Sequence, residues 1–161
     1  MTNLERVLNR FEERLRHRNH FTKEAWDVFY DYTIPINGDG FKDLPLNMSF
    51  IEVESVIHVR YMVCLDREAN KIDRQQLMDR INRFNKESQL LKAYIDDTNL
   101  KAEYNENVFL SKESFGEEFF LKMLWIESSL SNDYDKLFPV HRGSCKDINT
   151  DIFKRKGDKL S

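Results

Sequence analysis

The sequence predicts an α+β domain in which helices flank an antiparallel sheet, in the order α-β-β-β-α-β-β-α. Apolar residues recur at helical spacing in three segments, near residues 3–18, 73–85 and 114–134. Between these segments apolar and polar residues alternate with the period of two that is typical of strands. Turn-forming clusters at Asn37–Gly40 and Asp97–Asn99 interrupt the alternation. Runs of strands separated by single helices favour an α+β fold over a parallel α/β fold.

Length and composition fit one polar, globular domain. The chain has 161 residues, and its 40% hydrophobic and 12% aromatic content argues against intrinsic disorder. The net charge of −3 disfavours a protein that coats duplex DNA, because such proteins are usually basic. No apolar run approaches the roughly 20 residues of a membrane span. The first residues, MTNLERVLNRFEERLR, are too charged for a secretory signal, so we expect a cytoplasmic protein with no membrane partner.

The first expected element is a helix over residues 3–18. Asn3 is its candidate N-cap, and the opposite face is charged. Its apolar stripe consists of Leu4, Val7, Leu8, Phe11 and Leu15. A helix with one apolar stripe is expected to dock on the rest of the domain.

Strand character follows over residues 26–34 and 46–66. Aromatic and apolar residues alternate from Trp26 to Ile34, and the loop that follows is bracketed by Pro35 and Pro45. A shorter strand is expected at residues 48–53, before the longer one, and the pattern does not place the turn between the two.

The second half predicts a helix, a hairpin and a final helix. Asp73 is the candidate N-cap of the first helix. Residues 90–96 and 100–110 are expected to pair around Asp97–Asn99. Ser114 and Glu117 form a capping box for the last helix, whose stripe runs from Phe115 to Leu130 and on toward Tyr134. We therefore expect one domain over residues 1–138, and a basic C-terminal tail, disordered on its own, over residues 139–161.

No catalytic or metal-binding constellation emerges from the residues. His17 and His20 have metal-ligand spacing, but three arginines surround them and no third ligand is near in sequence. His58 and Cys64 share a strand face but lie about 20 Å apart at 3.3 Å per residue, too far for a base and its nucleophile. Cys64 and Cys145 form no paired motif and are expected to be reduced thiols. We expect no enzyme, no cofactor and no metal.

Charge is distributed unevenly along the chain. Residues 24–55 carry seven acidic residues and one lysine, whereas residues 1–23 and 139–161 each carry six basic residues against three acidic ones. The acidic residues are expected to form a solvated strand face rather than an acid–base pair. The two basic ends could form one electropositive patch, but a solvated face is the commoner outcome, so nucleic-acid binding is disfavoured.

Aromatic residues are the strongest pointer to function. They crowd a short region, namely Trp26, Phe29, Tyr30, Tyr32, Phe41, Phe50 and Tyr61. Both faces of the strands look apolar or aromatic, and the helices of a small domain cover only one face. A second apolar face needs another subunit or a partner.

A family resemblance enters in the second half. Asn82 and Asn85 end a helix, a hairpin runs from Leu91 to Tyr104, and a closing helix starts at Ser114. This arrangement resembles the YbjN family, bacterial sensory transduction regulators that share the fold of type III secretion chaperones, over about residues 22–137. The resemblance implies a dimeric, helix-flanked antiparallel sheet that binds a polypeptide without catalysis, with the asparagines shaping the exit from the helix. The basic tail, and the long acidic region around Gly38 to Pro45, depart from that pattern.

These observations favour a non-enzymatic protein-binding module, chaperone-like or regulatory, that is a homodimer in the cytoplasm. A partner segment would add to a sheet edge or lie across an apolar face. The predicted contact residues are Trp26, Tyr30, Tyr32 and Tyr61, although the same aromatics also suit a core. The alternative is a small regulator or inhibitor of a nucleic-acid-handling complex, acting through the acidic stretch and the basic tail.

Overall fold

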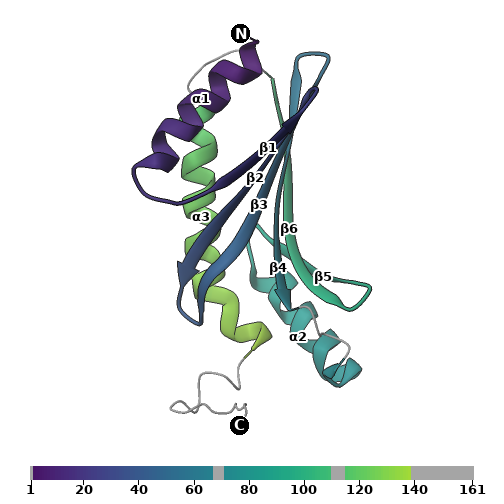
Figure 1. Cartoon of the computed structure of the whole chain (residues 1–161). Helices are drawn as coiled ribbons and strands as arrows, with labels where there is room; N and C mark the ends of the chain where they lie inside the picture. Colours follow the sequence, from purple (N-terminus) through teal and green to yellow (C-terminus); the bar gives the residue numbers. More distant parts are fainter. Residues whose placement is uncertain (1, 67–70, 110–114, 139–161) are drawn as a thin grey trace.

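The computed structural model describes residues 2–66, 71–109 and 115–138, which form three helices and six strands (Figure 1). In chain order these elements are α1 (Asn3–Arg16), β1 (Thr22–Trp26), β2 (Phe29–Gly38), β3 (Phe41–Val53), β4 (Val56–Asp66), α2 (Arg74–Glu87), β5 (Lys92–Asp96), β6 (Asn99–Phe109) and α3 (Phe115–Leu137). The predicted α+β class with an antiparallel sheet is confirmed. The structure adds one strand, because residues 22–38 form two strands rather than one.

The six strands form a single antiparallel sheet with the order β1-β2-β3-β4-β6-β5. Strands β1 to β4 follow one another as a meander. The chain then passes through α2 and returns as the hairpin β5–β6, in which β6 takes the place beside β4. The predicted hairpin is confirmed, with its turn at Asp97 and Thr98. Asp97 has a φ of 59°, in the left-handed region that aspartate tolerates.

The alternating residues 26–34 do not form a single strand, because a two-residue turn at Asp27 and Val28 interrupts them. Asp27 has a φ of 57°, and Trp26 pairs directly with Phe29 across the turn. Residues paired across a hairpin lie on the same face of the sheet. Trp26 therefore shares a face with Phe29, whereas Tyr30 and Tyr32 point to the opposite face, which corrects the single strand expected from the alternation.

Two further turns differ from the expected loop. Strand β2 continues through Asn37 and Gly38, the chain reverses at Asp39 and Gly40, and Pro35 pairs with Pro45 inside the ladder. Gly40 has a φ of 94°, which favours glycine. The turn between β3 and β4 lies at Glu54 and Ser55, whose φ values of 53° and 68° put two non-glycine residues in the left-handed region. That choice of residues explains why the sequence does not mark this turn.

The helices begin close to the predicted positions. Thr2, rather than Asn3, caps α1: its Oγ1 accepts from the Glu5 N–H at 3.1 Å, and its own N–H donates to Glu5 Oε1 at 2.7 Å. Helix α1 ends at Arg16, and its predicted apolar stripe is buried. Asp73 caps α2 as predicted, through the Gln76 N–H at 3.1 Å. The capping box at Ser114 and the basic tail lie outside the described residues.

The side chain of Asn85 joins α2 to β5. Its Nδ2 donates to the Ala93 carbonyl at 2.9 Å, and its Oδ1 accepts from the Ala93 N–H at 2.6 Å. These bonds fix the direction in which the chain leaves the helix. The role expected for Asn85 from the family resemblance is thus the one it has in the structure, whereas Asn82 is exposed.

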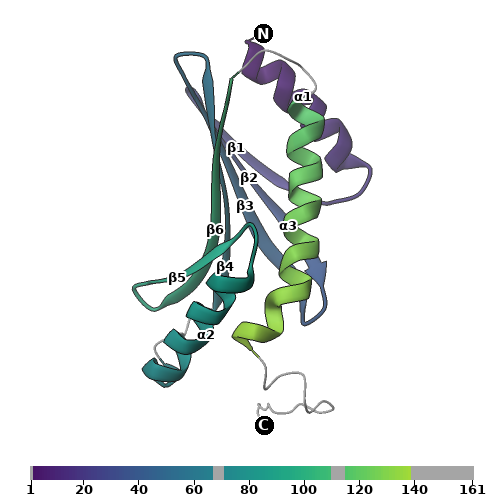
Figure 2. The ribbon, with the colours of Figure 1, turned by 180° about the vertical axis from the view of Figure 1, so that it is seen from behind.

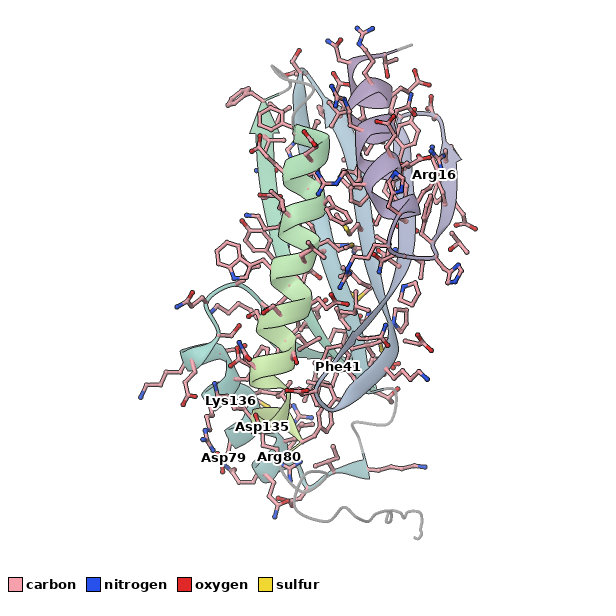
Figure 3. All side chains as sticks on the ribbon, turned by 90° about the vertical axis from the view of Figure 1, so that its left-hand side faces the viewer. Arg16, Phe41, Asp79, Arg80, Asp135 and Lys136 are labelled. Atoms are coloured by element: carbon pink, nitrogen blue, oxygen red, sulfur yellow. The ribbon has the colours of Figure 1, made fainter. Side chains whose placement is uncertain are left out.

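One hydrophobic core lies between the sheet and the helices. Helices α1 and α3 lie side by side on one face of the sheet (Figures 1 and 2), and the buried residues of α2 join the same cluster. Arg80 of α2 donates to the Leu137 carbonyl at 3.2 Å, beside the lower end of α3 (Figure 3). Phe11, Tyr32 and Phe50 pack at ring distances of 5.3 to 5.7 Å in the centre of the core.

The opposite face of the sheet, called the open face below, is not covered by any helix in the described residues. Strand β4 shows the difference: Ile57, Val59 and Tyr61 are buried toward the helices, whereas His58 and Arg60 are exposed on the other side. The sheet therefore has one packed face and one available face.

Candidate functional site

The four predicted contact residues do not lie together. Trp26 is on the open face and is 53% exposed, whereas Tyr32 and Tyr61 on the helix side have no exposed surface. Tyr30 shares the helix side with Tyr32 and is half-buried. A partner cannot touch Tyr32 or Tyr61 in this structure, so the prediction is wrong for those two residues. The hidden turn at Asp27 is the physical reason, because it separates Trp26 from the tyrosines that follow.

Tyr32 and Tyr61 instead hold carboxylates on the helix side of the sheet. The Tyr32 hydroxyl donates to Glu12 Oε2 at 2.6 Å, and Lys23 and Arg16 also bind this buried carboxylate at 2.6 and 3.0 Å. The Tyr61 hydroxyl donates to Glu106 Oε2 at 2.6 Å. Burial, together with the neighbouring carboxylate, raises the pKa of both tyrosines. Both residues are accounted for by the core.

Trp26 belongs to an apolar surface at the end of the open face where the β1–β2 and β3–β4 turns lie. Cross-strand pairing places two rows there, and both rows are apolar. The first row is Trp26–Phe29–Ile51, and the second is Val53–Val56–Phe109. These six residues are called the turn-end patch below.

The turn-end patch is accessible despite its apolar character. Val53 is 49% exposed and Phe109 is 74% exposed. The rings of Trp26 and Phe29 stack at 4.8 Å with an interplanar angle of 27°. Sequence reasoning named Trp26 and Phe29 but missed Ile51, Val53, Val56 and Phe109. These four residues are brought together by the register between paired strands. The alternation within a single strand does not contain that information.

A groove lined by both apolar and polar side chains overlaps the apolar rows on the open face. It has a volume of about 480 Å³, and it is lined by Phe29, Ser49, Ile51, His58, Val59, Arg60, Asn105 and Asn107. His58 Nδ1 lies 2.6 Å from Asn107 Oδ1. A partner that covers the turn-end patch would thus also meet amide, imidazole and guanidinium groups.

The groove wall on the β2 side is held by one carboxylate. Asp31 Oδ1 accepts from Asn47 Nδ2 at 2.6 Å and from Ser49 Oγ at 2.9 Å. Arg60 Nη2 lies 3.4 Å from Asn47 Oδ1, a long contact. These side chains support one another across β2, β3 and β4.

Acidic side chains surround the turn-end patch. Four of the seven acidic residues between positions 24 and 55 lie on the open face of β1 and β2 or at the β1–β2 and β3–β4 turns, namely Glu24, Asp27, Asp31 and Glu54. Glu52, in contrast, pairs with the buried Ile57 and points to the helix side. The one lysine in that range, Lys42, lies near the opposite end of β3. The patch is thus apolar with an acidic border.

The chemistry-bearing residues weighed in the sequence do not form a site in the described part of the chain. His17 ends α1 and is exposed, as is His20. Cys64 is half-buried on β4, and His58 of the same strand pairs with Asn107 rather than with the thiol. Among the described residues, no three His, Cys, Asp or Glu side chains are grouped to hold a metal ion.

Comparison with known proteins finds a likeness to a solved structure. No family model matches the chain, and no curated protein matches it. The chain is similar to the crystal structure of YbjN from E. coli, a protein proposed to be a transcription regulator, with a TM-score of 0.44 and 14% identity. The match covers 83% of this chain and 91% of that chain. At this identity the likeness concerns the fold alone.

None of the described helices is both long and apolar enough to cross a bilayer.

Proposed function

We propose that this protein is a non-enzymatic protein-binding module, chaperone-like or regulatory, and that it binds its partner through the open face of the sheet. The observation that carries the proposal is the turn-end patch. Helices cover one face of the sheet, and the uncovered face gathers six apolar side chains at one end. Contiguous exposed apolar surface of this kind is typical of a docking site.

Trp26 is the expected anchor of the interface. Tryptophan is the residue type most often found at binding hot spots, and this one is stacked on Phe29 so that little side-chain entropy remains to be lost on binding. The polar side chains of the adjoining groove supply donors and acceptors of the kind that surround such anchors. A partner lying across the face would use both.

The experiment compares two tryptophans of similar exposure. Trp26 is 53% exposed on the open face, and Trp125 is 49% exposed on α3. A protein captured from the native host by the wild-type chain should be lost with Trp26→Ala and retained with Trp125→Ala. Truncation of a hot-spot residue costs about 2 kcal/mol or more, which is roughly a 30-fold loss of affinity. Equal capture by both variants would contradict the proposal.

The homodimer expected from the sequence is a separate proposal that the same variants test. Sedimentation equilibrium of the wild-type chain would show a dimer, and a monomer with Trp26→Ala would place the second copy on the turn-end patch. A wild-type chain that sediments as a monomer at all concentrations would end the dimer proposal without affecting capture of another protein.

A further inference from the structure

We propose that the C-terminal segment of this chain, Ile152–Lys156, docks in cis on the turn-end patch and thereby acts as an internal competitor of the partner. This proposal rests on the protein-binding function proposed above, because both use the same surface. The segment reads Ile-Phe-Lys-Arg-Lys, two large apolar residues followed by three cations. The patch offers two apolar rows with an acidic border.

Charge complementarity favours docking of this segment on the turn-end patch over docking of other parts of the chain. The segment carries three adjacent positive charges, whereas four carboxylates, those of Glu24, Asp27, Asp31 and Glu54, and no lysine border the patch between residues 24 and 36 and between residues 48 and 55. His58 pairs directly with Ile51 of the patch, and Arg60 lies two residues further along β4, so these two groups border the patch on its groove side only. The segment's aromatic residue, Phe153, would add a third ring to the stack of Trp26 on Phe29. An apolar contact bordered by opposite charges gives both affinity and orientation.

Chain length permits the contact and limits it. Helix α3 starts six residues after Phe109 of the patch and runs 23 residues to the opposite end of the sheet, about 35 Å away at 1.5 Å per residue (Figure 1). Residues 139–151 separate Phe138 from Ile152, and a fully extended chain of that length spans about 46 Å. Because α3 lies on the covered face, the chain must also pass around the sheet to the open face, roughly 10 Å more, so the segment reaches the patch only when the connecting residues are almost fully extended. Removal of residues 142–147 would leave a span of about 26 Å, which is too short.

Docking of this kind has a consequence for the partner. A partner that binds the patch must displace the segment, so its own contact region is expected to combine apolar and basic residues. Weakening the internal contact would make more of the patch available and raise the partner's apparent affinity.

The test uses the full chain carrying Trp125→Phe, so that Trp26 is the single tryptophan and can be excited selectively over the tyrosines. With the natural tail, Trp26 should be shielded from acrylamide. The variant K154E/R155E/K156E should show red-shifted emission and stronger quenching, and a synthetic peptide of residues 149–161 should restore the shielding. The matched control, R142E/K146E/K159E, makes the same change in net charge within the tail and should leave Trp26 shielded. Salt at 1 M, where the Debye length falls to about 3 Å, should weaken the difference.

Two outcomes would overturn the proposal. Quenching of Trp26 that is the same in the natural chain and in K154E/R155E/K156E would show that the segment does not cover the patch. Shielding that survives deletion of residues 142–147 would exclude the intramolecular contact. Either result, combined with partner capture that is still lost in Trp26→Ala, would leave the protein-binding function standing. Loss of the capture difference between Trp26→Ala and Trp125→Ala, with tail shielding intact, would overturn the function alone.

Discussion

The buried carboxylate of Glu12 shows how individual residues hold the first strands against α1. Tyr32, Lys23 and Arg16 all donate to this side chain, which is only 8% exposed and is surrounded by a network of donors. Such a group is costly to leave without partners. Tyr32 thus has a structural role, although its residue type and its sequence neighbours led to its prediction as a contact residue.

Tyr32→Phe should destabilise the protein. The variant removes one hydrogen bond to the buried Glu12 carboxylate, with an expected cost of about 1.5–3 kcal/mol in the free energy of unfolding. Tyr94→Phe is the matched control, because its 2.7 Å bond to Glu103 is exposed and its loss should change little. Urea unfolding at neutral pH measures both values. A Tyr32→Phe midpoint equal to that of Tyr94→Phe would contradict this role.

The buried tyrosines should also make stability fall in alkali. The folded-state pKa of Tyr32 and of Tyr61 lies above the ordinary value of 10.0, mainly because of burial. Above pH 10 the unfolded chain releases protons that the folded chain retains, so the free energy of unfolding falls with rising pH by up to about 1.4 kcal/mol per unit for each tyrosine. Urea unfolding at several pH values between 9 and 11 measures this slope. A slope that is unchanged in Tyr32→Phe would count against the assignment.

At the scale of elements, hairpin turns decide which residues share a face. Helix caps, apolar stripes and the β5–β6 hairpin could be predicted, because each depends on residues close together in the sequence. The turns at Asp27–Val28 and Glu54–Ser55 could not, because neither contains glycine and neither is marked by a break in the apolar pattern. The turn-end patch was missed for the same reason: it is made by register between strands.

Asn85 links two elements and should be sensitive to truncation. Asn85→Ala removes both hydrogen bonds to Ala93, which leaves a backbone N–H and carbonyl without these partners at the start of β5. The expected loss is about 1–3 kcal/mol in the free energy of unfolding. Asn82→Ala, one turn earlier on an exposed site, should stay within about 0.5 kcal/mol of the wild type. Chemical denaturation of the pair checks this, and equal losses would refute the linking role.

Gly116 sets the distance between α3 and α1. A Cβ atom at this position would lie 2.3 Å from the Val7 carbonyl oxygen and 2.6 Å from Arg10 Cβ, so the helices would have to move apart. Gly116→Ala should therefore destabilise the protein by about 1–3 kcal/mol, although alanine is the better helix former. Ser128→Ala on the exposed side of α3 serves as control. Thermal unfolding would contradict this close packing if Gly116→Ala were as stable as the wild type.

At the scale of the whole molecule, the defining feature is a six-stranded sheet with helices on one face only. The sequence predicted the fold class and the need for a partner, which was inferred from too many aromatics for one core. Most of those aromatics are in the core after all, and the surface that needs covering is smaller and lies at one end of the open face. A partner is still expected, but this expectation now depends on Trp26 and its neighbours in two cross-strand rows.

The most direct measurement is site-specific photo-cross-linking in the native host, with benzoylphenylalanine in place of Trp26 or of Trp125. The two positions are about equally exposed, so nonspecific collisions should label them alike. A polypeptide cross-linked at position 26 and absent at position 125 is the result expected if the open face is the binding surface. No cross-link at position 26, or the same products from both positions, would contradict it.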